Sequence, residues 1–257
     1  MLNKINRIIA CMKEYFFDFL YLITHKDVIL IYQMGKVGSS SIVKSLKDIG
    51  IYCIHTHRLN TKYPFTTKFQ KIYQTLRAKM IKRFLKNKNI KIVTLTRDPI
   101  GRNLSGFFQN LEDFTYQSNT QQQFLLNLFF EKENSFYTIN WFNNEIKKIF
   151  DIDVYEYSFP KDSGFQIIKK GNVQIFVTKI EQLNSVQSEL GSFLGVNNFE
   201  LHNTNESEKK WYSNLHKIIK KEINFPKEYI DDRYESRYMK HFYTDEEIAM
   251  FREKWLK

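Results

Sequence analysis

The sequence predicts an α/β protein in which a parallel β-sheet is covered by helices on both faces. Three short apolar segments, 28–32, 50–54 and 90–96, resemble buried strands and alternate with segments of helical periodicity. The chain has nine glycines and four prolines among 257 residues. This is roughly half the usual share and favours long helices over a loop-rich β protein. Because no repeat, linker or low-complexity segment interrupts the pattern, we expect one domain over 1–257 with a helical C-terminal region over 200–257.

Composition excludes several classes of protein. Hydrophobic residues make up 42% and aromatic residues 16% of the chain, which is too much for wholesale disorder. The two cysteines, Cys11 and Cys53, form no CxxC motif and no cluster with histidine. This excludes a disulfide framework and a structural zinc site, and it favours a reducing, cytoplasmic setting without a metal. The net charge of +11 predicts an anionic partner, either nucleic acid, a phosphorylated nucleotide, an acidic polysaccharide or a lipid headgroup.

The N-terminal segment 1–25 has the pattern of an amphipathic helix. Charged residues at Lys13, Glu14 and Asp18 interrupt its apolar runs, so it is neither a membrane span nor a signal sequence. Two interpretations stay open: the helix packs on its own domain, or it is a basic helix that lies on a membrane or pairs with another subunit. The apolar positions, at steps of three and four, are Leu2, Ile5, Ile9, Met12, Phe16, Leu20 and Ile23.

Further elements follow from local patterns. Asp98 and Pro99 are typical of the N-cap and the first residue of a helix, so a helix is expected to begin there. Residues 169–172 have the composition of a hairpin turn. Helical periodicity extends over 65–88, most of 99–150, 180–194 and most of 207–257 with a break near Pro226. β-like segments occur at 153–157, 165–168 and 173–178.

A glycine-containing loop separates the first strand from the next helix. Such a turn directs backbone N–H groups and the positive end of the helix dipole at one point, which is suited to phosphate or sulfate. The pattern GxxxxGK[ST] of nucleotide hydrolases is absent, because Lys36 precedes the second glycine and the third strand ends in Arg97 rather than a carboxylate. A turn without a ligand remains the alternative. The loop comprises Gly35, Lys36, Val37, Gly38, Ser39, Ser40 and Ser41.

A second candidate anion site begins at Arg97, at the carboxyl end of the third strand, where open α/β sheets bind ligands. Ser105 lies two turns into the following helix, on the face shared with Arg102 and Gln109. An arginine fork with a nearby hydroxyl can hold a phosphate dianion. The alternative is that Arg97 pairs with Asp98 or with a helix C-terminus.

Together the two segments resemble the sulfotransferase superfamily, most closely the carbohydrate sulfotransferases. Their 5′-phosphosulfate loop, PKxG(S/T)(S/T), is matched by residues 35–40 with Gly35 in place of proline. Their 3′-phosphate motif, RDPxxRxxSxF, is matched by residues 97–107 at every specified position. Residues 208–213 (EKKWYS), with His241–Tyr243 and Trp255 further on, look like a bacterial capsular polysaccharide synthesis family with an NKWYS-like signature, except that the leading Asn is missing.

The resemblance implies a three-layer fold of the P-loop type and 3′-phosphoadenosine 5′-phosphosulfate (PAPS) as donor. It implies transfer of a sulfuryl group to a hydroxyl of a carbohydrate, either a capsular or surface glycan or its precursor. In this family the glycine loop with Lys36 holds the 5′-phosphosulfate, and Arg97 and Ser105 hold the 3′-phosphate. Lys209 and Lys210 reach the donor from a C-terminal loop or simply begin a solvated helix.

The chemistry requires a cation and a base. Lys36 would neutralise the charge that develops on the departing phosphate oxygen. His55 and His57 are expected to follow the second strand and, two residues apart on an extended segment, to face the same way, so either is a candidate for taking the acceptor's proton. A packing or substrate-orienting role, or a metal pair, stays open for them. Glu112 and Asp113 are the reserve bases.

Two other functions are weighed against sulfuryl transfer. The charge and the aromatic content are compatible with a nucleic-acid-binding module, although no RNP, KH or helix-turn-helix signature is present. A phosphotransferase with a degenerate P-loop is the other alternative. The sequence contains no motif for the acceptor, which we expect to contact loops 58–75 and 110–125.

Overall fold

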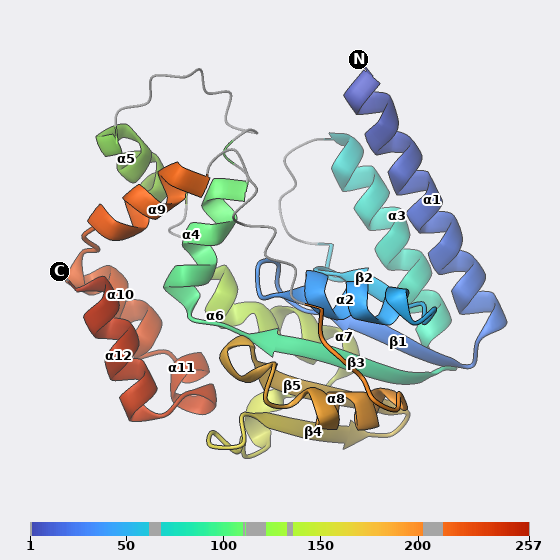
Figure 1. Ribbon diagram of the computed structural model, residues 1–257. Helices are drawn as coiled ribbons and strands as arrows, with labels where there is room; N and C mark the ends of the chain where they lie inside the picture. Colours follow the sequence, from blue (N-terminus) through green and yellow to red (C-terminus); the bar gives the residue numbers. More distant parts are fainter. Residues whose placement is uncertain are drawn as a thin grey trace.

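The computed structural model describes residues 2–61, 68–109, 111, 122–132, 136–202 and 213–256. Its centre is a five-stranded sheet in the order β2-β1-β3-β5-β4. The first four strands in this order are parallel, and β4 pairs antiparallel with β5 (Figure 1). The strands are β1 (Asp27–Tyr32), β2 (Ile54–Thr56), β3 (Asn89–Thr96), β4 (Phe165–Lys170) and β5 (Val173–Lys179). The predicted mixed α/β fold with a mostly parallel sheet is confirmed.

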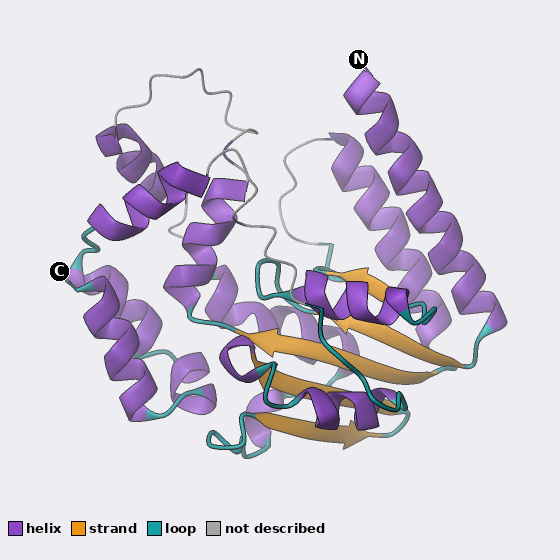
Figure 2. Cartoon of the chain, viewed as in Figure 1, coloured by secondary structure: helices purple, strands orange, loops and turns teal. Residues whose placement is uncertain are grey.

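Helices cover both faces of the sheet. Figure 2 shows α2 (Ser39–Asp48) and α8 (Gln187–Leu194) in front of the strands, with α6 (Tyr137–Phe142) and α7 (Lys148–Phe150) behind them. Residues 92–96 of the central strand β3 are all buried. A strand covered on both faces has no polar side to expose, which is why this segment reads as a continuous apolar run with two threonines.

The second strand lies further along the chain than predicted. The sequence placed it at 50–54, but Ile54, His55 and Thr56 are the residues that pair with β1. The reason is that Gly50, with φ +74°, ends α2 and the N–H of Ile51 bonds the carbonyl of Leu46 at 2.9 Å. This C-terminal cap uses the backbone that a strand would need. His55 is therefore part of β2, and only His57 follows it.

Two other predictions were wrong. Residues 153–157 were expected to form a strand, but Val154–Glu156 form a 3-10 helix because the Asp153 carboxylate accepts the N–H of Tyr155 at 3.1 Å. The helix predicted over 180–194 is broken: Ile180–Gln182 are a 3-10 turn and α8 begins only at Gln187. The β4–β5 hairpin is confirmed, with Lys170 paired to Val173 across the turn.

The remaining helices flank the sheet at its two ends. At one end, α1 (Leu2–Thr24) lies along α3 (Lys68–Leu85) (Figure 1). At the other end, a group of helices gathers beside α4 (Pro99–Gln109) (Figure 1). They are α5 (Gln122–Lys132), α9 (Ser213–Glu222), α10 (Lys227–Tyr234), α11 (Arg237–Phe242) and α12 (Asp245–Trp255). Residues 143–147, between α6 and α7, form a π-helical turn.

Candidate functional site

The glycine loop and Arg97 meet at one edge of the sheet. Strands β1, β3 and β5 are parallel neighbours, so their carboxyl ends open on the same side. The loop 33–38 follows β1, Arg97 follows β3 and Glu181 follows β5. Three segments that are far apart in the sequence therefore bring their polar groups to one place.

The loop takes a shape that its residues alone do not favour. Lys36 has φ +71° and Gly38 has φ +88°, both in the left-handed region. A side chain at Gly38 would place its Cβ 2.7 Å from Cδ1 of Ile180, so glycine is required there on both grounds. For Lys36 the same conformation costs about 1 kcal/mol, a strain typical of binding sites. Gly38 caps α2, whose first N–H groups open on the loop.

Two arginines hold this loop by its carbonyl groups. Nη1 of Arg97 donates to the carbonyl oxygen of Lys36 at 2.6 Å, and Nε of Arg102 donates to that of Gly35 at 2.9 Å. The hydroxyl of Tyr238 accepts the N–H of Arg97 at 2.8 Å and donates to its carbonyl at 3.0 Å. The two predicted anion motifs are thus in direct contact.

Asp98 does not pair with Arg97, so that alternative is wrong. Its Oδ1 accepts the N–H of Ile100 at 3.1 Å, as expected of a helix cap, and α4 begins at Pro99. The same carboxylate accepts the Tyr234 hydroxyl at 2.7 Å and Nε1 of Trp255 at 3.0 Å. Asp98 therefore ties α10 and α12 to the end of β3, and the guanidinium of Arg97 stays directed at the loop.

His57 is held in a defined orientation beside the loop. Its Nδ1 donates to the carbonyl of Gln33 at 2.9 Å, which leaves the lone pair of the neutral ring on Nε2. That Nε2 lies 3.7 Å from the position that a Cβ of Gly35 would take. Burial, followed by the nearby charges of His55 and Arg102, lowers the pKa of His57 to about 3, so the ring is neutral at pH 7.

His55 lies next to His57 but is less suited to proton transfer. The ring centroids are 4.8 Å apart with the planes at 89°. Nε2 of His55 is buried and has no hydrogen-bond partner among the described residues. Burial, with a smaller contribution from Arg77, lowers the pKa of His55 to about 4. The two rings are side by side as expected, but only His57 borders the glycine loop.

A buried carboxylate fixes the chain that follows His57. Oε2 of Glu145 accepts the N–H groups of Leu59 and Asn60, each at 2.9 Å, and also the hydroxyl of Tyr32. Burial raises the pKa of Glu145. Nε1 of Trp141 donates to the His57 carbonyl at 3.1 Å. Glu145 lies in the π-helical turn, a distortion often found near functional sites, and this network keeps the histidine segment in place.

Helix α9 brings two basic residues that the sequence analysis missed. His216 packs edge-on against Phe108 of α4, with ring centroids 5.0 Å apart. Burial, then the charges of Lys220, Arg97 and Lys36, lower the pKa of His216. Burial and the charges of Lys254 and Arg97 likewise lower the pKa of Lys220. Their spacing of four residues puts them on one helix face, but nothing in the sequence indicates which face meets the loop.

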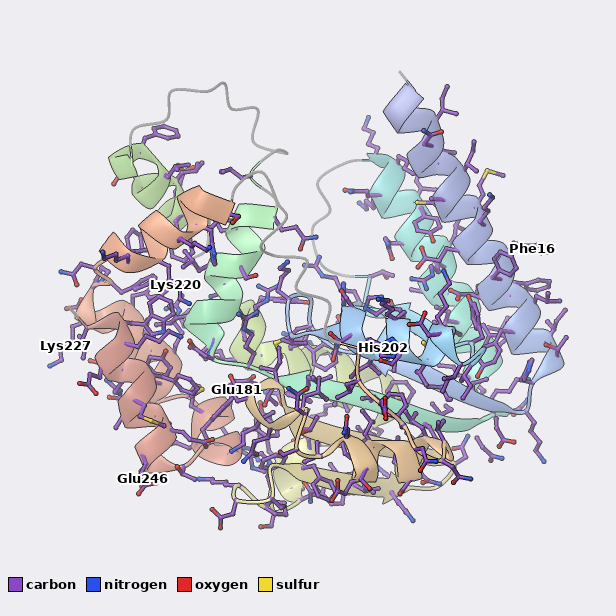
Figure 3. All side chains as sticks on the ribbon, viewed as in Figure 1. Phe16, Glu181, His202, Lys220, Lys227 and Glu246 are labelled. Carbon is purple, nitrogen blue, oxygen red and sulfur yellow. The ribbon has the colours of Figure 1, made fainter. Side chains whose placement is uncertain are left out.

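Glu181 is a third residue that the sequence analysis missed. Its carboxylate lies after β5, where Oε1 accepts the N–H of Asp98 at 3.4 Å and Oε2 accepts the hydroxyl of Tyr243 at 3.3 Å. Burial raises its pKa. Figure 3 labels Glu181, in the 3-10 turn after β5, and Lys220 on α9. A single glutamate after a strand gives no distinguishing sequence signal.

Some of the other predicted residues are described by the structure, and others lie outside the described residues. Ser39 is buried, Ser40 is exposed and Ser41 is half-buried at the start of α2, while Val37 is buried in the core. Ser105 is half-buried in α4 and makes no hydrogen bond to Arg97 or to the glycine loop, all of which the structure describes. The predicted residues Glu112, Asp113, Lys209 and Lys210, together with much of the expected acceptor loops, lie outside the described residues.

Two family models match the chain. The sulfotransferase family matches residues 20–147, which include the glycine loop, both histidines and the Arg97 motif. The NKWYS family, described as "Putative capsular polysaccharide synthesis protein", matches residues 113–244, or 132 of the 257 residues. No curated protein and no solved structure matches the chain significantly. The chain therefore belongs to the NKWYS family, and its N-terminal half matches the sulfotransferase family, as its two loop motifs indicated.

Proposed function

We propose that this protein is a PAPS-dependent sulfotransferase with a P-loop-type sheet, and that it sulfates a hydroxyl of a capsular or surface glycan or of its precursor. The sulfotransferase-family match supports a transferase that takes a nucleotide donor and an acceptor. The NKWYS match supports a carbohydrate acceptor. PAPS as the donor is what the likeness to the sulfotransferase family implies, and the two neighbouring loops agree with it.

The observation that carries the proposal is the bond of 2.6 Å between Nη1 of Arg97 and the Lys36 carbonyl. It brings Arg97, at the end of β3, into contact with the glycine loop at the end of β1, which supports two neighbouring phosphate sites. A ligand with anionic groups at both ends of one ribose fits this arrangement. A nucleotide with a single phosphate chain would not need the second site.

The charges at the site fit such an anion. Arg97 makes no ion pair with a carboxylate among the described residues, and its hydrogen bonds run to the Lys36 carbonyl and the Tyr238 hydroxyl. The fields of Arg97 and Lys36 oppose protonation of His216, and that of Arg97 opposes protonation of Lys220. Positive charges at this site thus repel one another, although the buried Glu181 carboxyl lies in the field of Arg97, and a dianion would relieve the repulsion.

Each residue then has a defined task. The donor supplies the sulfuryl group, and its S–O bond to the 5′-phosphate breaks as the bond to the acceptor oxygen forms. Lys36 offsets the charge left on the departing phosphate oxygen, worth about 3–4 kcal/mol for one well-placed donor. Nε2 of His57 accepts the acceptor's proton, since its lone pair is free of the Nδ1–Gln33 hydrogen bond. A bound anion next to the ring raises the low pKa of His57 and so makes it a better base.

Calorimetric titration with adenosine 3′,5′-bisphosphate tests the donor site. We expect saturable binding at one site, without magnesium. Absence of heat together with an unchanged melting temperature would remove the proposal. Incubation with ³⁵S-labelled PAPS and a panel of bacterial surface polysaccharides and their precursors then tests transfer.

A pair of variants tests the base. His57→Asn keeps an N–H donor for the Gln33 carbonyl, in the side-chain amide, but has no counterpart of Nε2. The transfer rate is therefore expected to fall about a hundredfold or more, while the affinity for the bisphosphate is retained. His55→Asn is the matched control in the same strand segment and should transfer much faster than His57→Asn. The reverse order would assign the proton to His55.

A further inference from the structure

Helix α1 carries an apolar stripe that no described residue covers. The side chains of Ile5, Ile9, Met12, Phe16, Leu20 and Ile23 are between 41% and 67% exposed. They recur at steps of four and three residues, so they lie along one face of a helix 23 residues long. Exposed Phe17 extends the stripe at one margin. A continuous apolar face of this length is unusual on the surface of a protein that functions alone in water.

The helix is attached to the protein through its opposite face. Asp18 is buried and accepts Nε of Arg77 at 2.7 Å, and Glu14 pairs with Nη2 of the same arginine at 3.1 Å. The hydroxyls of Tyr52 and Tyr73 donate to Asp18 and Glu14 at 2.7 and 2.6 Å. Glu14 and Asp18, two of the three charged residues that interrupt the apolar pattern, thus form the inner face of α1. The apolar stripe is the outer face, where Figure 3 shows Phe16 at the edge of the molecule.

Positive charge surrounds the stripe. The helices α1 and α3 contain nine basic and two acidic residues, which gives +7 of the protein's net charge of +11. Both acidic residues, Glu14 and Asp18, are turned inward to Arg77. Lys13 is exposed beside Met12, and on α3 the exposed cations include Lys79 and Arg83. The outer surface of this helix pair therefore combines apolar and cationic groups, and its partly exposed acidic side chain, Glu14, is paired with Arg77.

We propose that α1 lies flat on an anionic lipid bilayer, with its apolar stripe in the headgroup region and exposed cations of α1 and α3, such as Lys13, Lys79 and Arg83, near the lipid phosphates. An amphipathic helix with aromatic and aliphatic residues on one face and cations beside them binds in this way. Within the described residues no helix is long and apolar enough to cross a membrane. The contact is consequently interfacial.

The charge argues against a second copy of the chain as the occupant. A twofold contact through α1 would bring two helix pairs together, each with a net charge of +7. Like charges at such close range cost free energy, whereas an anionic surface attracts the same groups. The proposal does not depend on the proposed sulfotransferase activity, because none of its residues belongs to the loop site.

Co-sedimentation with vesicles tests the proposal on the full-length protein. We expect binding to phosphatidylcholine vesicles that contain about one third phosphatidylglycerol, little binding to pure phosphatidylcholine, and weaker binding as salt is raised. Equal binding to both vesicle types would overturn the role of charge, and binding to neither would overturn the proposal.

A matched pair of methionines locates the contact. Met12 on α1 is 67% exposed and Met250 on α12 is 61% exposed, so a glutamate is tolerated by the fold at both positions. Met12→Glu is expected to reduce binding to the anionic vesicles about tenfold or more, and Met250→Glu to leave it unchanged. Thermal unfolding of both variants checks that the fold is retained. Equal loss in the two variants would contradict the assignment.

The oligomeric state in solution tests whether a second copy of the chain, rather than a bilayer, covers the stripe. A protein that is a dimer in solution, that Met12→Glu converts to a monomer, and that does not bind vesicles would show that a second copy covers the stripe. Light scattering on both proteins gives this result directly. We expect a mass that does not depend on Met12.

Discussion

Arg77, which is buried, and Arg97, which is half-buried, differ in the groups that surround their positive charges. Arg77 lies between α1 and α3 and pairs with Asp18 at 2.7 Å and Glu14 at 3.1 Å. Arg97 lies at the end of β3 and donates to the Lys36 carbonyl instead. The charge of Arg77 is balanced by two ion pairs inside the protein, whereas Arg97 makes no ion pair among the described residues and acts on the buried Glu181 carboxyl only through its field.

The difference distinguishes a structural cation from a binding cation. A charge removed from water needs a partner, and within the protein Arg77 has two carboxylates. Asp98 is the carboxylate nearest in sequence to Arg97, but it is engaged by Tyr234 and Trp255. The arrangement leaves Arg97 available to an anion from solution, and each prediction below contrasts these two situations.

The largest effect is expected from Arg77→Met, which leaves Asp18 buried without its cation. The free energy of unfolding should fall by about 3–5 kcal/mol, because an unpaired buried charge is strongly destabilising. Urea denaturation measures this. Affinity for adenosine 3′,5′-bisphosphate should be unchanged in the folded variant, and a large loss of affinity would contradict the separation of the two regions.

Lys36→Gly is expected to separate activity from stability. Transfer should fall about 10²–10³-fold because the cation at the leaving oxygen is lost. Stability should be unchanged or rise by up to about 1 kcal/mol, since glycine adopts the φ of +71° without strain. Steady-state transfer and thermal unfolding provide the two readings. Lys36→Ala, which retains the backbone strain, is the control. It should show the loss of transfer without the gain in stability.

Arg97→Ala should weaken bisphosphate binding by about 2 kcal/mol, or about thirtyfold, by removing a charge-assisted contact. Loss of its bond to the Lys36 carbonyl should lower stability by only about 1 kcal/mol. Calorimetry and urea denaturation are the measurements. Arg252→Ala, which breaks ion pairs between C-terminal helices, should leave the affinity intact. An unchanged affinity in Arg97→Ala would place the 3′-phosphate elsewhere.

The smallest effect is a shift in the titration of His216. In the free protein burial and the neighbouring cations lower its pKa below 6.5. Removing the Arg97 charge or adding the bisphosphate favours the protonated ring, so either change should raise this pKa, and binding near pH 6 should take up protons. NMR titration of the ring protons measures the shift. Arg77→Met should not alter it.

Much of the fold was predictable because local patterns and tertiary contacts agree. The run 90–96 has the composition of a doubly covered strand and forms β3, and Asp98-Pro99 begins α4 as expected. The strand predicted at 50–54 failed because the cap of α2 at Gly50 uses that backbone, which displaces β2 to Ile54–Thr56. The expectation of one domain, the cytoplasmic setting and the roles of the site residues stay predictions.

The candidate site was only partly predictable. The glycine loop and the Arg97 motif are contiguous in sequence, so each could be recognised by its spacing. His216, Lys220 and Glu181 have no such spacing to the loop, and their position depends on how α9 and β5 pack. Arg102 belonged to the motif, yet its bond to the Gly35 carbonyl is visible only in the folded protein.

The sequence by itself determined the two anion motifs, the alternation of strands and helices, and the apolar stripe of α1, since each depends on residues that are near one another in the chain. Tertiary structure decided which histidine borders the loop and on which side of the protein the stripe of α1 lies. It also decided that Asp98 bonds to side chains of α10 and α12 and does not pair with Arg97. Periodicity defines a helix face, but the partners available in the folded protein decide which way that face turns. For α1 these partners are Arg77, Tyr52 and Tyr73, which hold its polar face inward.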